Sequence, residues 1–465
     1  MKAFETYAED LLRRHGVPGA AVAAAQDGVL TYTRGFGWAD VEHGIPAAAD
    51  TVFGVASVTK SFTAAAIMRL ADGGRLSVDD PVVEHLPEFR MPHGDAAAVR
   101  IHHVLTHTAG LPPLPSRWYA FGASARADAE GAPPPVNVEA RPPFETPADL
   151  MTYLAELDWS PLGPPGAQFS YSNEGFALLG AIIARVSGRP YARYLSEEIL
   201  EPAGLARTWL GPAPDRPSGA EDGVTVPYVA RQHDGGRTAV PARTWWYSDV
   251  WNPAGGLCST VTDLARYLDL YRTGGVVRRQ RILSEASIAA MTRAHVAVSP
   301  GQAYGYGLGV LPEYRGRTLI EHGGGRRSIS AHVAAVPARG VAVAVLANVA
   351  EAPVRAIAHG LLNVLQGAAP ETPAIVYPDY ACPPERLASY AGEYRSGEGT
   401  LLRAGAADGR LVLEVDGERL AARAVGPDAF IVNARGTDQY VRFLTDAAGP
   451  AQAVAYGSRI ITRTG

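Results

Sequence analysis

A proline-rich segment, QGAAPETPAIVYPDYACPPE, occupies residues 366–385 and divides the chain into two parts with different sequence patterns. Such a segment is typical of a linker. After it, short alternating runs are separated by turn sequences such as Asp416-Gly417 and Gly426-Pro427-Asp428. Short, regularly spaced strands of this kind predict an up-and-down β-barrel. We therefore expect a large first domain at residues 1–365, a linker at 366–385 and a small all-β barrel at 386–465.

The first part predicts a domain of mixed secondary structure. Two apolar runs flank Gln26-Asp27-Gly28, as in a β-hairpin, and ISAHVAAVPARGVAVAVLANVA predicts two strands on either side of residues 337–340. Helices are expected at the start of the chain and over residues 53–74, 176–186, 195–200, 260–271 and 353–366. Such a set favours an antiparallel sheet with a helical lobe, an α/β (α+β) class. The segment 111–147, rich in Pro, Ala and Gly, is too long for a simple connection and is interpreted as a binding loop or a lid.

Charge and composition exclude several classes of function. The formal net charge of −5 over 465 residues argues against nucleic acid as a partner. The first residues, MKAFETYAEDLLRRHG, carry charges between apolar positions and lack the apolar core of a signal peptide. No apolar run of about eighteen residues offers a membrane span. Cys258 and Cys382 form neither a disulfide framework nor a metal-ligand pattern. We expect a cytoplasmic protein without membrane partners.

The helix FGVASVTKSFTAAAIMRLADGG contains Ser57 three residues before Lys60. A helix N-terminus presents unpaired N–H groups and a partial positive charge, which favour a developing alkoxide or oxyanion. Lys60 lies one turn further on and can return to the face of Ser57. A serine needs an adjacent base to act as a nucleophile, and a desolvated lysine can serve as that base. A Ser-x-x-Lys pair alone also occurs by chance, so its interpretation depends on the rest of the chain.

Two further segments supply groups that this pair would need. GAQFSYSNEGFALLG places Tyr171 and Asn173 just before a helix, where a phenol could relay a proton and an amide could orient Lys60 or the substrate. IEHGGGRRSISAHV places His322 at the end of a strand before three glycines, which allow close approach of a substrate. The N–H groups of Ser57 and Gly325 could then form an oxyanion hole. Taken singly, these residues could equally be a core tyrosine, a helix cap and a glycine-rich turn.

In this order, the motifs resemble those of the serine β-lactamase and penicillin-binding-protein family. The resemblance is strongest to its class C, esterase and D-peptidase branch, in which His often replaces the Lys of the third motif. VLTHTAGL at 104–111 and PAGGLCSTVTDLARYL at 253–268 fit the same family, and the resemblance covers residues 1 to about 365. Many relatives have a glycine shortly after the third motif, where this chain has Arg326-Arg327-Ser328. The charge and shape of the substrate pocket are therefore expected to differ.

The resemblance implies a role for each motif residue. Ser57 would attack an acyl group, and Lys60 and Tyr171 would move protons. Asn173 would position the substrate, Gly323 and Gly324 would line its path, and His322 would support the tyrosine or the acyl group. No metal or other cofactor is implied. His102, His103 and His107 invite a metal interpretation, but they lack a third ligand at a recognisable spacing, and VLTHTAG occurs in metal-free relatives.

The acceptor of the acyl group decides the function. In architecture, the chain resembles penicillin-binding-protein-type thioesterases, which carry a C-terminal lipocalin-like domain and cyclise nonribosomal peptides released from a carrier protein. In those enzymes, an arginine near the end of the barrel points to the active site, and Arg463 is at the matching place. Alternatively, Arg463 could be an exposed charge on the last strand of the barrel. Trp245, Trp246 and Trp251 could line an apolar pocket or pack in the core.

We therefore expect a peptide-cyclising acyltransferase that accepts a peptidyl thioester, with Arg326 and Arg463 among its substrate contacts. The main alternative is a cytosolic hydrolase, namely a D-aminopeptidase, a D-stereospecific amidase or an esterase. A third possibility, from another class, is a sensor that is acylated without turnover.

Overall fold

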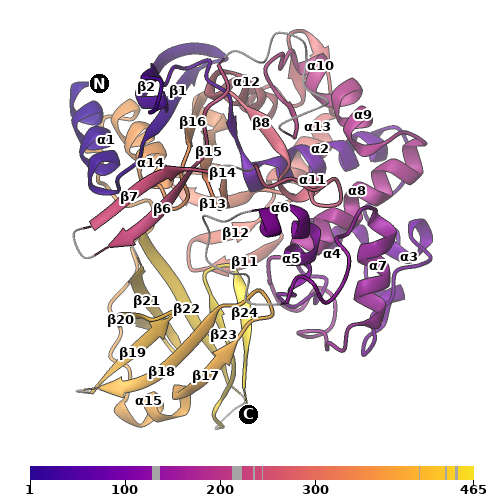
Figure 1. Cartoon of the computed structure of the whole chain (residues 1–465), viewed down its shortest axis with the longest axis vertical. Helices are drawn as coiled ribbons and strands as arrows, with labels where there is room; N and C mark the ends of the chain where they lie inside the picture. The colour runs from indigo at the N-terminus through magenta and orange to yellow at the C-terminus, as the bar shows by residue number, and fades with distance from the viewer. Residues whose placement is uncertain are drawn as a thin grey trace.

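The computed structural model describes residues 1–127, 137–211, 223–233, 236–242, 245–407, 409–434, 437–445 and 449–464. Its centre is a nine-stranded antiparallel sheet with the strand order β11-β12-β13-β14-β15-β16-β1-β2-β3 (Figure 1). The strands are β1 (Gly19–Gln26), β2 (Val29–Asp40), β3 (Ile45–Pro46), β11 (Val296–Ser299), β12 (Gln302–Tyr304), β13 (Gly309–Tyr314), β14 (Arg317–Arg326), β15 (Ile329–Val336) and β16 (Val341–Ala347). The hairpins predicted at residues 26–28 and 337–340 are both present.

Helices cover both faces of this sheet, so its central strands have no solvent face. In β1, Ala21 and Ala23 belong to one apolar core, while Val22 and Ala24 belong to another. This alternation explains why β1 is apolar at nearly every position, as expected for a strand buried on both sides. The helices α1 (Lys2–Arg14) and α14 (Val354–Leu365) close the second core, and α2 (Thr59–Asp72), α8 (Asn173–Ser187) and α12 (Val261–Arg272) belong to the first.

The remaining elements form the helical lobe and small accessory sheets. The lobe contains α3 (Val82–His85), α4 (Ile101–Leu105), α7 (Pro147–Glu156), α9 (Tyr191–Leu195), α10 (Glu201–Ala203), α11 (Asn252–Gly255) and α13 (Glu285–Thr292). A three-stranded sheet joins β4 (Phe53–Gly54), β8 (Leu257–Ser259) and β5 (Trp209–Leu210). Two pairs stand apart, β6 (Tyr228–His233) with β7 (Gly236–Pro241), and β9 (Val276–Val277) with β10 (Gln280–Arg281). No helix among the described residues is both long enough and apolar enough to cross a membrane.

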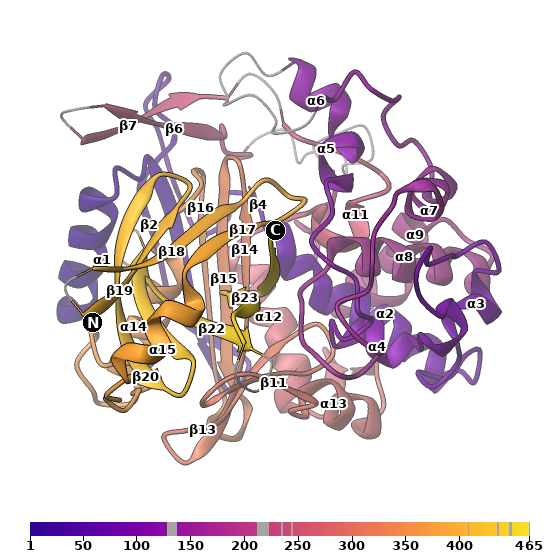
Figure 2. The same cartoon turned by 90° about the horizontal axis from the view of Figure 1, so that it is seen from below.

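The C-terminal region forms a closed eight-stranded antiparallel barrel with strands in sequence order, which confirms the predicted up-and-down barrel. Its strands are β17 (Gly392–Arg395), β18 (Leu401–Ala407), β19 (Arg410–Val415), β20 (Glu418–Gly426), β21 (Ala429–Ala434), β22 (Thr437–Thr445), β23 (Ala451–Tyr456) and β24 (Arg459–Arg463), with α15 (Pro384–Tyr390) before them. Leu413, Phe430, Phe443 and Val454 fill its interior. The barrel packs against one end of the larger region, residues 1–365, and Figure 2 shows the barrel from below.

The segment 111–147, interpreted from its sequence as a binding loop or a lid, contains two short helices among its described residues. These are α5 (Ser116–Ala120) and α6 (Gly122–Ala127), and residues 128–136 lie outside the described part. A barrel turn rests on this segment, since the Gly397 N–H donates to the Pro113 carbonyl at 3.0 Å and Trp118 Nε1 donates to the Glu398 carbonyl at 3.2 Å. The segment thus links the two parts of the molecule.

Candidate active site

Ser57 lies in a single 3-10 turn, Ala56–Val58, that leads directly into α2. Ala56 has a φ of 44°, a left-handed conformation that is unfavourable for alanine, so the backbone is strained beside the serine. The turn is held because β4 pairs with β8 just before it. Ala56 and Val58 are buried, while Ser57 is partly exposed. The fold therefore presents the Ser57 hydroxyl at the start of a helix, as the sequence predicted.

Lys60 is fully buried, and its amine lies within hydrogen-bonding distance of three oxygen atoms. Nζ is 3.2 Å from Ser57 Oγ, 2.8 Å from Asn173 Oδ1 and 2.6 Å from the Ala254 carbonyl oxygen. A neutral amine has two N–H donors and one lone pair, so donation to the two amide oxygens leaves the lone pair facing the serine hydroxyl. Burial, followed by the positive charge of Arg459, holds the pKa of Lys60 well below its usual value. This geometry suits a general base.

Tyr171 and Asn173 are positioned by the start of α8. Ser172 caps this helix by accepting from the Gly175 N–H, and its own N–H donates to His107 Nδ1 at 3.1 Å. The His107 ring lies against Tyr171, with 4.1 Å between ring centroids, and Lys60 Nζ lies 4.7 Å from the centre of the Tyr171 ring. Burial raises the pKa of Tyr171, while its hydrogen bond with Ser57 acts in the opposite direction. Tyr171 is therefore a neutral phenol able to donate a proton.

The three glycines of β14 bring this strand against the turn that carries Ser57. A Cβ atom at Gly324 would lie 2.1 Å from the Val55 carbonyl oxygen, a distance that only glycine permits. At Gly325, a Cβ atom would meet nothing within 4 Å, so the space in front of this residue is open. The structure thus places Gly325 and Ser57 on neighbouring segments, as the predicted oxyanion hole requires.

His322 makes its close contacts with Tyr304, a residue that the sequence analysis missed. Its Nδ1 is 2.7 Å from the Gly323 carbonyl, which can only accept, so Nδ1 carries the proton and Nε2 accepts from the Tyr304 hydroxyl at 2.9 Å. The centroids of His322 and Tyr171 are 6.2 Å apart. Burial, and then the charge of Lys60, lower the pKa of His322 to about 3. His322 is therefore a neutral histidine that makes ring contact with Tyr171 and a hydrogen bond with Tyr304.

Two turns of the barrel complete the site. The backbone N–H of Tyr171 donates to the Ser458 carbonyl at 2.8 Å, and the Arg459 guanidinium lies 4.6 Å above the Tyr171 ring. From the turn between β17 and β18, Glu398 accepts from Arg459 Nε at 2.8 Å and from Arg459 Nη2 at 3.2 Å. The side chains of Arg459 and Glu398 are 19% and 10% exposed. A buried ion pair from the barrel thus lies beside the catalytic tyrosine.

The arginine at the active site is not the one we expected. Arg463 donates from Nη1 to the Ala451 carbonyl at 3.1 Å and from Nη2 to the Ala391 carbonyl at 2.7 Å, so it is held within the barrel. The prediction that Arg463 points to the active site is wrong, and Arg459, four residues earlier, takes that place. The reason is that β24 leaves the active site after its first residues, so its last arginine lies on the far part of the strand.

The wall beyond Gly325 combines arginines with aromatic rings. The Arg326 guanidinium lies 5.6 Å from the centre of the Phe121 ring and 3.5 Å from the Gly255 carbonyl, next to the Ala254 carbonyl that contacts Lys60. Burial lowers the pKa of Arg326 to about 10. Trp251 is 5% exposed and belongs to the main core, so core packing rather than pocket lining describes it. Trp245 and Trp246 are both partly exposed and are therefore more accessible than Trp251.

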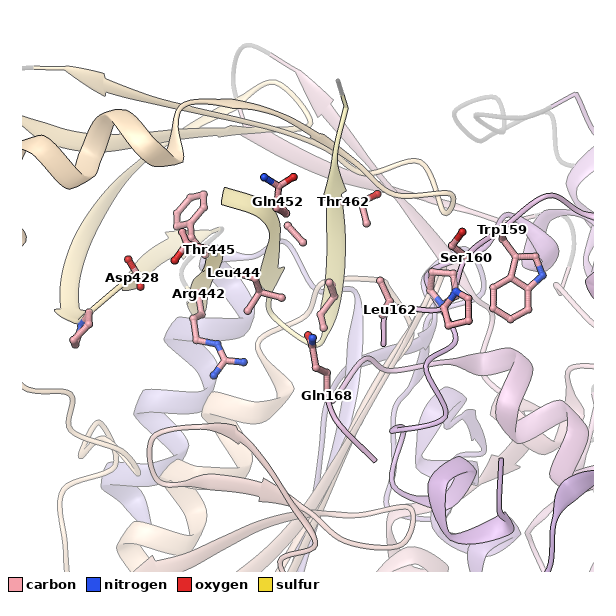
Figure 3. A pocket seen from close by; sticks show the side chains of 16 residues that line it. Trp159, Ser160, Leu162, Gln168, Asp428, Arg442, Leu444, Thr445, Gln452 and Thr462 are labelled. Atoms are coloured by element: carbon pink, nitrogen blue, oxygen red, sulfur yellow. The ribbon is translucent and has the colours of Figure 1, made fainter. Parts of the chain in front are cut away.

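A separate groove of about 850 Å³ runs between the barrel and the catalytic region. Figure 3 shows Trp159, Leu162 and Gln168 on one side and barrel residues such as Leu444 and Thr462 on the other. Two residues that line the groove, Gln168 and Ile460, are close in sequence to Tyr171 and Arg459 of the active site. Neither Ser57 nor Lys60 lines it.

The three histidines considered as metal ligands make separate contacts. His102 Nδ1 forms a hydrogen bond with the Tyr306 hydroxyl at 2.8 Å, and His103 Nδ1 accepts from the Arg100 N–H at 3.1 Å. His107 Nδ1 accepts from the Ser172 N–H. Among the described residues, two other groups have the ligand types and spacing for a metal, namely Glu321 with His332 and His359, and Asp80 with Glu84 and His85. Neither group includes Ser57, Lys60, Tyr171, Asn173 or His322, although Glu321 directly precedes His322 in the sequence.

Comparison with known proteins agrees with this geometry. The family model described as Beta-lactamase matches residues 4–367. The chain belongs to this β-lactamase family. Esterase EstB of Burkholderia gladioli is 29% identical over 68% of this chain and 81% of its own length.

Solved structures extend the similarity to the barrel. The octameric penicillin-binding protein homologue from Pyrococcus abyssi is 28% identical, with a TM-score of 0.70 over 100% of this chain and 99% of that chain. SurE is 25% identical, with a TM-score of 0.72 over the same shares. A D-stereospecific amidohydrolase from Streptomyces sp. is 26% identical, with a TM-score of 0.61 over 77% of this chain and 96% of that chain. The protein is accordingly a serine hydrolase or acyltransferase that works through an acyl-enzyme.

Proposed function

We propose that this protein is a stand-alone thioesterase that cyclises linear peptides head to tail. The observation that carries the proposal is the pair of barrel turns beside Tyr171, which add Arg459 and Glu398 to the catalytic centre. Exclusion of water favours attack by an amine over hydrolysis. The resemblance to penicillin-binding-protein-type thioesterases and the whole-chain similarity to SurE support the same proposal.

In the acylation step, Ser57 Oγ attacks the carbonyl carbon of a peptidyl thioester and passes its proton to Lys60 Nζ. The N–H groups of Ser57 and Gly325 hold the oxyanion. The C–S bond then breaks, and the thiolate takes a proton from the Tyr171 phenol, which recovers one from Lys60. Asn173 keeps Lys60 in place, and the Arg459 charge beside Tyr171 stabilises the transient tyrosinate.

In the second step, the neutral N-terminal amine of the same peptide attacks the Ser57 ester. The amine nitrogen loses one proton through Tyr171 and Lys60, the C–Oγ bond breaks, and Ser57 Oγ takes up a proton. The products are a macrolactam and the free serine. We expect the acyl donor to arrive on a peptidyl carrier protein in the cytoplasm, and a D-residue at the acyl position. The 26% identity to a D-stereospecific amidohydrolase supports the last expectation.

The test is mass spectrometry of products from a linear peptide that ends in a D-residue and carries a small thiol as the leaving group. A cyclic product has the mass of the substrate minus the thiol, whereas the linear acid is heavier by one water. Cyclic product formed by the wild-type enzyme and not by Ser57→Ala is the expected result. Linear acid alone overturns the proposal.

The second candidate is a hydrolase that acts on D-amino-acid amides or simple esters. It is favoured by the similarity to esterase EstB and to the D-stereospecific amidohydrolase. If the thioester gives only linear acid, hydrolysis of D-amino-acid amides and of short-chain esters would distinguish the two kinds of hydrolase.

A further inference from the structure

Glu398 is a carboxylate that the barrel inserts into the catalytic centre. It lies in the turn Ser396–Thr400, whose position depends on Gly397, because a Cβ atom there would come within 2.6 Å of the Pro113 carbonyl. The Trp118 indole donates to the Glu398 carbonyl and fixes the turn from the other side. Taking a carboxylate out of water is costly, even when it is paired. A turn built to hold one beside Tyr171 therefore points to a ligand.

The Glu398 carboxylate has unoccupied hydrogen-bond acceptor positions. A carboxylate offers about four acceptor positions. Arg459 occupies one on each oxygen, and no other donor among the described residues reaches either oxygen. The second buried carboxylate nearby, Glu174, also has one side-chain donor on each oxygen, from the hydroxyl groups of Ser116 and Ser172, but its own backbone N–H adds a third hydrogen bond. Glu398 is thus the carboxylate that can accept from an incoming cation.

The charges around Glu398 are compatible with the binding of a cation. Arg459, Arg117 and Lys60 act on its carboxylate from three different elements. Burial, followed by the charge of Arg459, holds the pKa of Lys60 well below its usual value, so Lys60 carries less positive charge than an ordinary lysine. The other charged groups of this cluster are the two arginines and the carboxylates of Glu398 and Glu174. Burial, and then the charge of Glu398, raise the pKa of Glu174, whereas the pKa of Glu398 is lowered, so Glu398 is the carboxylate whose negative charge an additional cation would meet.

We propose that Glu398 binds the protonated α-amino end of the peptide substrate and holds it near Ser57; in a cyclase, this ammonium then gives one proton to solvent, and the neutral amine attacks the Ser57 ester. The inference rests on the proposed function in one respect, since it assumes a peptide substrate. In a cyclase the N-terminus must reach the acyl-serine, and in an aminopeptidase it belongs to the acylating residue. A plain ester has no such group. Glu398 therefore selects substrates with a free amine, whichever acceptor later takes the acyl group.

The test compares three versions of one peptide thioester, with a free, an N,N-dimethylated or an N-acetylated terminus, by the kcat/KM of thiol release near pH 7. Only the first two carry a positive charge. For the wild-type enzyme, both charged forms should exceed the acetylated form by about tenfold or more, the usual worth of a hydrogen bond to a charged group. In Glu398→Gln this ratio should fall to within about twofold. Glu393→Gln, which removes a partly exposed carboxylate of the same barrel that pairs with Arg395 and Arg403, should keep the full ratio.

Equal rates for the three substrates with the wild-type enzyme would overturn the inference, and this comparison stands even if Glu398→Gln does not fold. An equal loss on all three substrates in Glu398→Gln would also overturn it, because Glu398 would then only hold Arg459. The products answer a separate question. If thiol release prefers charged substrates but yields linear acid only, the cyclase proposal fails and the role of Glu398 stands.

Discussion

The charge of Arg459 should control the pH at which Lys60 becomes a base. The Arg459 guanidinium carbon and Lys60 Nζ lie 4.6 Å and 4.7 Å from the centre of the same Tyr171 ring, so they are about 9 Å apart at most. At an effective dielectric constant of about 20, two positive charges at about 9 Å repel by about 2 kcal/mol. That repulsion corresponds to roughly one pKa unit at Lys60.

Substitution of Arg459 by Gln removes this repulsion and raises the pKa of Lys60. Because the base must be neutral, kcat/KM rises with pH as Lys60 loses its proton. In the variant, kcat/KM should therefore reach its plateau at a pH about one unit higher than in the wild-type enzyme. The assay is thiol release from the N-acetylated thioester, which has no amine of its own that titrates.

Glu398 provides the opposite perturbation, since its negative charge raises the pKa of Lys60. Glu398→Gln should therefore shift the acidic limb of the pH profile of kcat/KM to lower pH. The double variant, which removes both charges, should return close to the wild-type profile. If Arg459→Gln leaves the limb in place, Lys60 is not the group that titrates, and the reasoning is refuted.

Four further substitutions test other parts of the site. Gly324→Ala should lose at least about a hundredfold in activity or fail to fold because its Cβ would meet the Val55 carbonyl, whereas Gly325→Ala should keep the wild-type melting temperature; circular dichroism and thiol release measure both. Tyr171→Phe should slow thiol release by about 10² to 10⁴-fold with little change in melting temperature, and a smaller loss would remove Tyr171 from the proton path. The pKa of His322 is about 3, below that of an unfolded histidine, so the unfolded state binds more protons and stability falls as pH drops from about 6.5 towards 3. His322→Asn should flatten that fall in urea unfolding, and an unchanged slope would contradict a buried neutral histidine.

Much of the catalytic centre could be predicted from the sequence because its residues lie in ordered motifs with fixed neighbours. Ser57 and Lys60 are one turn apart on a helix, and Tyr171 and Asn173 stand at the start of another, so local geometry decides where they point. The barrel followed from its short alternating runs, and the sheet from apolar runs that are buried on both faces.

The contribution of the barrel could not be predicted in the same way. Which end of β24 faces the catalytic region depends on the docking of the barrel, so the sequence favoured Arg463 where the structure has Arg459. Glu398 sits in an ordinary polar turn, SGEGT, that carries no signal of a buried charge. Tyr304 resembles any aromatic residue of a strand, and its contact with His322 becomes visible only when β12 and β14 are placed in one sheet.

The central claim is that catalysis passes through an acyl group on Ser57. The most direct measurement is intact-mass analysis, followed by peptide mapping, of the full chain after brief exposure to a fluorophosphonate and to the peptide thioester. We predict one adduct, located at Ser57, which the thioester forms and loses during turnover, and no adduct on Ser57→Ala. A Ser61→Ala control, which changes a buried serine on the same helix, should react as the wild-type enzyme does. An adduct at another residue, or full activity of Ser57→Ala, would contradict the mechanism.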